Sequence, residues 1–152
     1  DGSLIDYYVD KYAFETDPET LAAVTDAVAA ELDGTTVDLL AGPALGAVPL
    51  VTAASLESGV PAAFVRGDVA HEGTQARIEG EVRKGQRVVL LDDVSMTGGT
   101  LLDAASAVEN AGGVVERVLV VVDRGEGAAE RVRDAGYRFD ALVRIGEDLA
   151  VE

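Results

Sequence analysis

Two short stretches of the chain contain only apolar residues, and they constrain the fold more than any other feature. They are VVLL at 88–91 and VLVVV at 118–122. A β-strand that is apolar on both faces has to be covered from both sides, as the strands of a parallel sheet are. Because segments with helical spacing alternate with the strand-like segments, the sequence predicts an α/β fold built on a doubly wound parallel sheet.

Capping and turn residues set the limits of the expected elements. Asp17 and Pro18 predict the start of a helix, and Gly34 predicts its end. The other helices are expected at 47–58, 100–111 and 127–135, and the strands at 6–12, 37–42, 61–66, 76–82, 87–91, 114–123 and 137–145. The polar segment 67–75 is predicted to be a mobile loop, after which the chain returns as a β-hairpin flap.

Length and composition predict a single domain. A chain of 152 residues that is 48% hydrophobic can bury one core and hardly two. No apolar stretch is long enough for a membrane span, and the absence of cysteine excludes disulfides and cysteine-ligated metals. These features fit a cytoplasmic protein. The opening residues, DGSLIDYYVDKY, look like the middle of a domain edge, so we expect a further N-terminal segment before them.

The charge of the chain excludes two classes of partner. Twenty-eight acidic residues face 12 basic ones, which gives a formal net charge of −16, and Lys11 and Lys84 are the only lysines. Such a chain repels nucleic-acid backbones and anionic membranes, so neither is an expected partner. Acids spread along the whole sequence with few lysines look like the proteins of salt-adapted archaea. A solvated surface in high salt is the simpler interpretation, and an acidic partner-binding surface is the alternative.

The stretch VVLLDDVSMTGGT at 88–100 carries the chemistry. Thr97, Gly98, Gly99 and Thr100 lie between an expected strand and an expected helix. Glycines let successive N–H groups point into one concavity, and the start of a helix favours an anion there. The turn is neither a Walker A loop nor a dinucleotide fingerprint. It predicts a phosphate cradle, although many glycine-rich turns of this kind bind nothing.

Two adjacent acids, Asp92 and Asp93, come directly before this turn. Buried carboxylates are costly unless they have partners, and the two hydroxyls of a vicinal diol can each donate a hydrogen bond to them. A ribose 5-phosphate carries a diol and a phosphate on one ligand, which explains both halves of the motif. In the alternative interpretation, Asp93 caps a turn and Asp92 binds a metal or an arginine.

The motif resembles the phosphoribosyl pyrophosphate signature of type I phosphoribosyltransferases. Nearly the whole chain resembles the orotate phosphoribosyltransferase branch, through YYVDKY (7–12), GPALGAVPL (42–50), FVR (64–66), RIEG (77–80) and VVVDRGEG (120–127). The resemblance implies transfer of ribose 5-phosphate from phosphoribosyl pyrophosphate to orotate, giving orotidine monophosphate and pyrophosphate in pyrimidine biosynthesis. It also implies Mg²⁺ bound mainly through phosphoribosyl pyrophosphate, and a homodimer.

The resemblance assigns roles to the matching positions. Asp92 and Asp93 would hold the ribose hydroxyls, with one of them stabilising positive charge on the ribose, and Thr97, Gly98, Gly99 and Thr100 would bind the 5-phosphate. The substrate-binding stretch would also include Val94, Ser95 and Met96. The turn that grips pyrophosphate would be Ala44, Leu45 and Gly46, with Gly46 allowing an unusual backbone conformation.

Two arginines complete the expected substrate-binding set. Arg66 would contact pyrophosphate, and Arg124 would face the carboxylate or carbonyl edge of orotate. The alternatives are a salt bridge from Arg66 to a loop acid and an ordinary surface position for Arg124.

The chain departs from the family pattern at two places. The family loop resembles R-K-x-x-K-x-[HY]-G, and here Gly67 and Ala70 stand where its lysines would neutralise departing pyrophosphate. His71 stands one residue before the position where the family pattern has histidine or tyrosine. It is a candidate proton donor or cation, or an ordinary exposed histidine. Met96 replaces a threonine, and either lines the base pocket or fills an apolar gap.

These departures leave two alternatives to an orotate enzyme. One is a catalytically weak or inactive paralogue that binds phosphoribosyl pyrophosphate or a nucleotide as a sensor. The other is a phosphoribosyltransferase for a different base.

Overall fold

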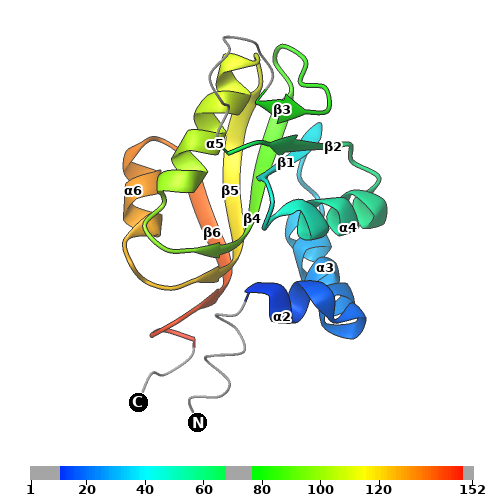
Figure 1. Cartoon of the computed structure of the whole chain (residues 1–152). Coiled ribbons are helices and arrows are strands. Elements are labelled where there is room, and N and C mark those ends of the chain that lie inside the picture. Colours follow the sequence, from blue (N-terminus) through cyan, green and yellow to red (C-terminus); the bar gives the residue numbers. More distant parts are fainter. Residues whose placement is uncertain (1–10, 68–76, 149–152) are drawn as a thin grey trace.

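The computed structural model describes residues 11–67 and 77–148, which form a six-stranded sheet with helices on both faces (Figure 1). The strand order is β3-β2-β1-β4-β5-β6. The bounds are β1 Leu39–Pro43, β2 Ala62–Val65, β3 Ile78–Glu79, β4 Arg87–Ser95, β5 Val114–Asp123 and β6 Arg138–Arg144. Neighbouring strands are parallel except β2 and β3, which are antiparallel. The predicted doubly wound sheet with its hairpin is therefore confirmed.

The helices begin and end close to the residues that the capping signals indicated. Their bounds are α2 Lys11–Thr16, α3 Pro18–Leu32, α4 Val48–Ser58, α5 Gly99–Asn110 and α6 Ala128–Asp134. The side chain of Asp17 accepts a hydrogen bond from the Thr20 N–H at 3.0 Å and caps α3. Gly59, at a φ of 77°, ends α4. No helix among the described residues has the length and apolar character needed to cross a bilayer.

The expected strand at 6–12 is wrong where the structure describes it. Lys11 and Tyr12 begin helix α2, and residues 6–10 lie outside the described part of the chain. Phe14, later in the same helix, is 2% exposed and packs into the core beside α3 and α4. Burial of that ring outweighs the local strand preference of the neighbouring tyrosines, because strand propensity depends strongly on tertiary context.

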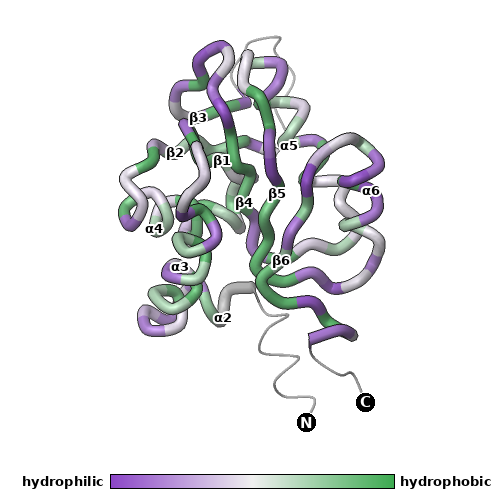
Figure 2. The backbone as a smooth tube through the Cα atoms, turned by 180° about the vertical axis from the view of Figure 1, so that it is seen from behind, coloured by the Kyte–Doolittle hydropathy of each residue, from purple (hydrophilic) through white to green (hydrophobic). Residues whose placement is uncertain are grey.

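Each face of the sheet has its own hydrophobic core. Leu90 and Val118 pack with α5 and α6 on one face. Leu91 and Leu119 pack with α3 and α4 on the other. Adjacent residues of a strand point to opposite faces, so the all-apolar stretches supply both cores, and the tube in Figure 2 is correspondingly hydrophobic over much of β4 and β5.

Strand β4 continues four residues beyond its expected end at Leu91, as far as Ser95. The extension stays paired with β5, since Asp92 is opposite Val120 and Ser95 is opposite Asp123. On its other side, β1 pairs with β4 only as far as Leu90. The ladder with β5 satisfies the backbone of the extension, so the acids lie in a strand, and the connection to α5 begins only after Ser95.

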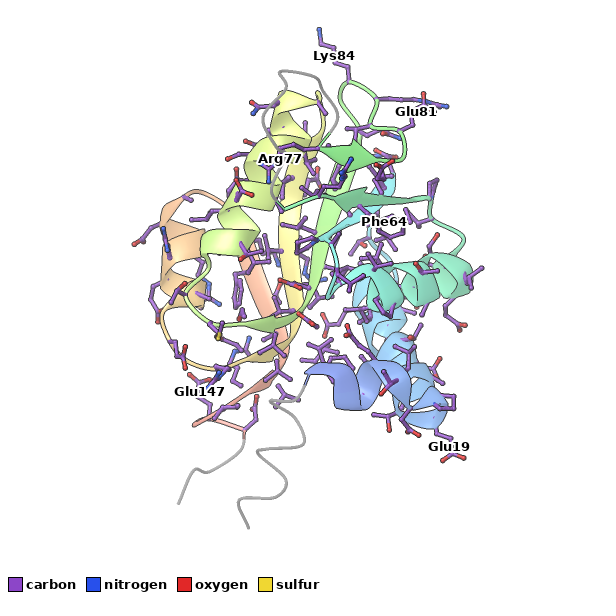
Figure 3. The ribbon with its side chains drawn as sticks, viewed as in Figure 1. Glu19, Phe64, Arg77, Glu81, Lys84 and Glu147 are labelled. Carbon is purple, nitrogen blue, oxygen red and sulfur yellow. The ribbon has the colours of Figure 1, made fainter. Side chains whose placement is uncertain are left out.

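Charged side chains are spread over the surface of the described structure. Figure 3 shows Glu19 in α3, Glu81 in the connection after β3 and Glu147 in the turn after β6, and all three are exposed. Lys84 is likewise exposed, in the turn between β3 and β4. This distribution is what a solvated acidic surface requires.

Candidate functional site

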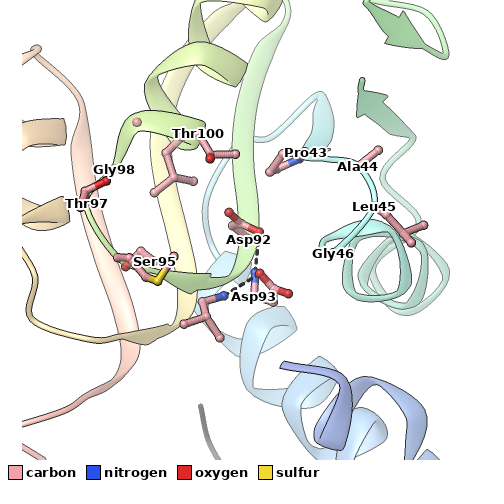
Figure 4. Close-up of a pocket in the computed structure, with 14 residues that line it drawn as sticks. Pro43, Ala44, Leu45, Gly46, Asp92, Asp93, Ser95, Thr97, Gly98 and Thr100 are labelled. Atoms are coloured by element: carbon pink, nitrogen blue, oxygen red, sulfur yellow. Dashed lines mark hydrogen bonds between the residues drawn. The ribbon is translucent and has the colours of Figure 1, made fainter. Parts of the chain in front are cut away.

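A cavity of about 250 Å³ opens beyond the carboxyl ends of β1 and β4 (Figure 4). Its lining consists of residues 43–46 and 92–101. Most of the predicted site residues therefore meet at one place, together with Pro43 and Leu101, which were not predicted. Figure 4 shows the acids with the 43–46 turn on one side and the 97–100 turn on the other. Ligands of doubly wound sheets bind at this end of the strands.

The two acids are buried at the floor of this cavity. Asp92 is 6% exposed and Asp93 is 4% exposed. The Asp93 N–H donates to Asp92 Oδ1 at 2.8 Å, and the Val94 N–H donates to Asp93 Oδ1 at 2.7 Å. Within the described part of the chain, Asp93 Oδ2 is buried and has no hydrogen-bond partner. Such an oxygen is unfavourable unless a ligand supplies the missing donor, as a sugar hydroxyl would.

The turn at 44–46 approaches the acids because Gly46 has no side chain. A Cβ at this position would lie 2.8 Å from Asp93 Oδ2. The φ of Gly46 is not in the left-handed region, so a positive φ is not the reason for this glycine. The peptide bond between Ala44 and Leu45 is cis, so the unusual conformation lies one step earlier. Gly46 is thus needed for close approach.

The 97–100 turn ends at the first residues of α5. Gly98 has a φ of 89° and is the N-cap, without a side-chain hydrogen bond to the first turn of the helix. An added Cβ there would also lie 3.3 Å from the Cα of Ala128 in α6, so both conformation and packing require glycine. Thr97 and Thr100 are exposed beside it. The first amides of a helix have no partner within the helix, and together with its positive end they favour an anion at this side of the cavity.

Arg124 lies next to the cavity without lining it. Its side chain is 34% exposed, and its Nη2 lies 3.4 Å from Glu126 Oε1. Its Nη1 donates to Met96 Sδ at 3.5 Å. Met96 lines the cavity and is 51% exposed, so the alternative that it fills an apolar gap is wrong. The two residues meet at the edge of the cavity.

Arg66 is placed outside the cavity lining. Its Nη1 lies 3.4 Å from Glu79 Oε1, and both side chains are more than half exposed. The salt bridge that was the alternative for Arg66 is therefore present, with an acid of strand β3 in place of a loop acid. His71 and Ala70 lie outside the described residues.

Arg77, which the sequence reasoning did not single out, holds the start of the hairpin. It donates to the carbonyl oxygens of Arg66 and Gly67, at 3.2 and 2.9 Å, and pairs with Asp103 of α5. Hydrogen bonds from Arg77 lower the pKa of Asp103, which burial would raise. The pair thus connects the hairpin to helix α5, which begins at the 97–100 turn.

Ser95 and Asp123 were also not predicted as a pair. Both are buried, and the Ser95 hydroxyl donates to Asp123 Oδ1 at 3.2 Å. Asp123 directly precedes Arg124 in the VVVDRGEG stretch, which is the one signal that could have drawn attention to it.

Comparisons with known proteins agree with this geometry. A family profile described as a phosphoribosyl transferase domain matches residues 13–140. An orotate phosphoribosyltransferase of Halobacterium salinarum is 44% identical over 151 residues, covering 99% of this chain and 85% of that protein. An orotate phosphoribosyltransferase of Methanopyrus kandleri is 49% identical over 143 residues, covering 93% and 76%.

A solved structure is similar over most of its length. The orotate phosphoribosyltransferase of Mycobacterium tuberculosis H37Rv, in complex with 5-phospho-α-D-ribosyl 1-diphosphate (phosphoribosyl pyrophosphate), superposes with a TM-score of 0.78. It is 33% identical, and the match covers 91% of this chain and 81% of that one. The sequence-based resemblance is confirmed, including its likeness to proteins of salt-adapted archaea.

Proposed function

Because the chain belongs to the phosphoribosyltransferase family, we propose that it transfers ribose 5-phosphate from phosphoribosyl pyrophosphate to orotate. The products are orotidine monophosphate and pyrophosphate, and the protein is a glycosyltransferase of pyrimidine biosynthesis. The archaeal relatives named above carry this activity in their names. They support an enzyme over a non-catalytic sensor.

One observation carries the proposal most directly. The cavity is lined by buried Asp93, whose Oδ2 has no hydrogen-bond partner among the described residues, and by the start of helix α5. The first calls for a hydrogen-bond donor, and the second calls for an anion. Ribose 5-phosphate offers hydroxyl donors at one end and a phosphate at the other.

Different parts of the cavity lining bind different parts of phosphoribosyl pyrophosphate. Asp92 and Asp93 accept hydrogen bonds from the ribose 2- and 3-hydroxyls, and the turn from Thr97 to Thr100 binds the 5-phosphate through its amides and hydroxyls. The Ala44–Leu45–Gly46 turn, across from the acids, contacts pyrophosphate. Each group of atoms on the ligand thus meets protein groups of complementary hydrogen-bonding character.

The chemical step exchanges one bond at the ribose C1 for another. The bond from C1 to the pyrophosphate oxygen breaks with its electron pair leaving on pyrophosphate. A ring nitrogen of orotate forms the new bond to C1 and gives up its proton, which the released pyrophosphate takes up. In a dissociative path the ribose becomes oxocarbenium-like and positively charged. Two buried carboxylates beneath the ring stabilise that charge, because a water-poor site strengthens such interactions.

Magnesium fits the donor set of the site. Mg²⁺ prefers oxygen ligands and usually keeps several waters, and Asp92 and Asp93 present carboxylate oxygens in the cavity. No group of three or more His, Cys, Asp or Glu in residues 11–67 and 77–148 is placed to hold a metal by itself. The ion would be held mainly by oxygens of phosphoribosyl pyrophosphate, where it would neutralise charge on the leaving group.

The acceptor end of the site is formed by Arg124 and Met96. The guanidinium of Arg124 faces the carboxylate or a carbonyl of orotate, for which its planar fork is suited. Met96 presents a weakly polar thioether where related loops present a hydroxyl donor. We assign His71 and Arg66 to the pyrophosphate end, His71 as proton donor or cation, and we expect a cytoplasmic homodimer.

A pyrophosphate-release assay tests the proposal. The protein in high salt is incubated with Mg²⁺, phosphoribosyl pyrophosphate and, in separate reactions, orotate, uracil, adenine or hypoxanthine. Release with orotate alone is the expected result. Tight binding of phosphoribosyl pyrophosphate without turnover of any base would instead establish a sensor, and turnover of another base alone would overturn the acceptor assignment. The variant Glu81→Gln, a change to one exposed charge outside the cavity, is the matched control.

A further inference from the structure

We propose that Ser95 and Asp123 are positioning residues that fix Arg124 at the edge of the cavity. The inference rests on the proposed function, because it assigns the pair a role at the acceptor end of that site. Neither side chain needs to touch orotate, since both act through the arginine that follows Asp123.

The pair lies at the level where two neighbouring strands end together. Ser95 is the last residue of β4, Asp123 is the last residue of β5, and the two are Cα partners in the ladder. Their exposed fractions are 3% and 6%. The Ser95 hydroxyl donates to Asp123 Oδ1 at 3.2 Å, and the Gly125 N–H donates to the same oxygen at 3.1 Å. A buried oxygen with two donors holds its neighbours in one arrangement.

The residues that follow the pair are the ones that meet at the acceptor end. Met96 follows Ser95, and Arg124 follows Asp123. The Arg124 N–H donates to the Ser95 carbonyl oxygen at 3.1 Å, and its guanidinium reaches Met96 Sδ at 3.5 Å. The backbone of Arg124 is therefore hydrogen-bonded to the last residue of β4, the strand that carries the sugar-binding acids. Its side chain contacts the residue that follows this strand.

Asp123 is also held from the β6 side of β5. The Ile145 N–H donates to the Asp123 carbonyl oxygen at 2.9 Å, beside the pairing of Asp123 with Arg144 of β6. The peptide unit that joins Asp123 to Arg124 is thus hydrogen-bonded on one side to the end of β4 and on the other side to the residue that follows β6. A long side chain loses much conformational entropy when a ligand fixes it, so a preformed arrangement improves binding of the acceptor.

Three variants of the whole chain test the inference. Ser95→Ala removes one hydroxyl, Asp123→Leu removes the shared acceptor, and Asp123→Asn keeps an amide oxygen that can accept the same two hydrogen bonds. Arg124→Ala is the reference. The measurements are the orotate KM and kcat, the Kd of phosphoribosyl pyrophosphate by calorimetry, the melting temperature, and ¹⁵N relaxation of the Arg124 Nε–H group.

We expect Ser95→Ala to raise the orotate KM about tenfold, the effect of one lost hydrogen bond, and Asp123→Leu, which loses two, to raise it at least as much. In Asp123→Leu the Kd of phosphoribosyl pyrophosphate should stay within about twofold of the wild-type value, because Asp123 does not line the cavity. Asp123→Asn should restore the KM to within about threefold, because the hydrogen bonds and not the charge are required. If the role of the pair were purely structural, the variants would lower the melting temperature and would change the orotate KM and the Kd of phosphoribosyl pyrophosphate together.

Two results would overturn the inference. One is an unchanged orotate KM in Ser95→Ala and Asp123→Leu while Arg124→Ala raises it. The other is an Arg124 Nε–H group as rigid in these variants as in the wild type, and this measurement decides even if orotate is not turned over. Absence of turnover in the wild type, or an unchanged KM in Arg124→Ala, contradicts the proposed function instead. Should Asp123→Leu fail to fold, Ser95→Ala alone gives the answer.

Discussion

The Cα of Gly46 packs against the Asp93 carboxylate so closely that an added Cβ would lie 2.8 Å from Oδ2. That oxygen is the one we assign to a ribose hydroxyl. The contact joins the turn after β1 to the acids of β4, so a side chain at this position is expected to displace the carboxylate first.

Gly46→Ala should therefore weaken binding of phosphoribosyl pyrophosphate by about tenfold or more, through loss of a charge-assisted hydrogen bond. Titration calorimetry with Mg²⁺ measures it. The contrasting variant is Gly42→Ala, whose Cβ would lie 2.6 Å from the Leu91 carbonyl oxygen. It should lower the free energy of unfolding by about 1–3 kcal/mol, because backbone cannot move aside as a carboxylate can. Equal binding in Gly46→Ala and the wild type would contradict the assignment.

Asp93→Asn tests the same oxygen by chemistry. The carboxamide cannot offer two anionic acceptors, so the Kd of phosphoribosyl pyrophosphate should rise about 10- to 100-fold, as for a lost hydrogen bond to a charged group. The fold should be kept, because the amide oxygen can still accept the Val94 N–H. Unchanged affinity would sink the diol assignment.

The pair of Arg77 and Asp103 should make stability depend on pH. Hydrogen bonds from Arg77 hold the pKa of Asp103 below its ordinary value in the folded state. Its contribution to stability is therefore complete above the unfolded pKa, near 4, and is lost as the pH falls through the folded pKa. Urea denaturation between about pH 5 and 3 should show a steeper loss in the wild type than in Asp103→Asn. Asp26→Asn, an exposed acid of α3, serves as control, and parallel curves for the wild type and Asp103→Asn would refute the prediction.

Removing the acidic partners of Arg117 should lower the free energy of unfolding more than removing Arg117 itself. Its side chain is 6% exposed and lies 2.6 Å from Glu31 and 2.8 Å from Asp140. The double variant Glu31→Gln, Asp140→Asn leaves a buried cation uncompensated and should lower the free energy of unfolding by about 3–5 kcal/mol. Arg117→Met removes that cation and should cost less. Chemical denaturation gives both values, and the reverse order would disprove this account.

The sequence predicted the elements whose signals are local. Asp17 and Pro18 start α3 as expected, and strand β5 covers the predicted 114–123. The end of β4 was missed, because two adjacent acids look like a loop until a neighbouring ladder is known to satisfy their backbone. The strand expected at 6–12 failed for a related reason, since burial of Phe14 depends on helices that are distant in the sequence.

The site was predictable where it is continuous in sequence. The acids and the glycine turn form one stretch, so their shared cavity followed from the motif. The pairing of Ser95 with Asp123 depends on the register between β4 and β5, which a single sequence does not contain. The close contact of Gly46 with Asp93 likewise depends on how far β1 runs beside β4.

The extension of β4 separates what is hard to alter from what is easy to alter. The acids belong to a central strand, and moving them would disturb both cores at once. Arg124 belongs to a short connection after β5, where substitutions disturb little besides the acceptor. Under selection for a new base, such a protein would keep the residues proposed to bind the sugar phosphate and would change in the connection after β5. Descendants of one ancestor can therefore use the same phosphoribosyl donor and differ in the base that accepts the ribose phosphate.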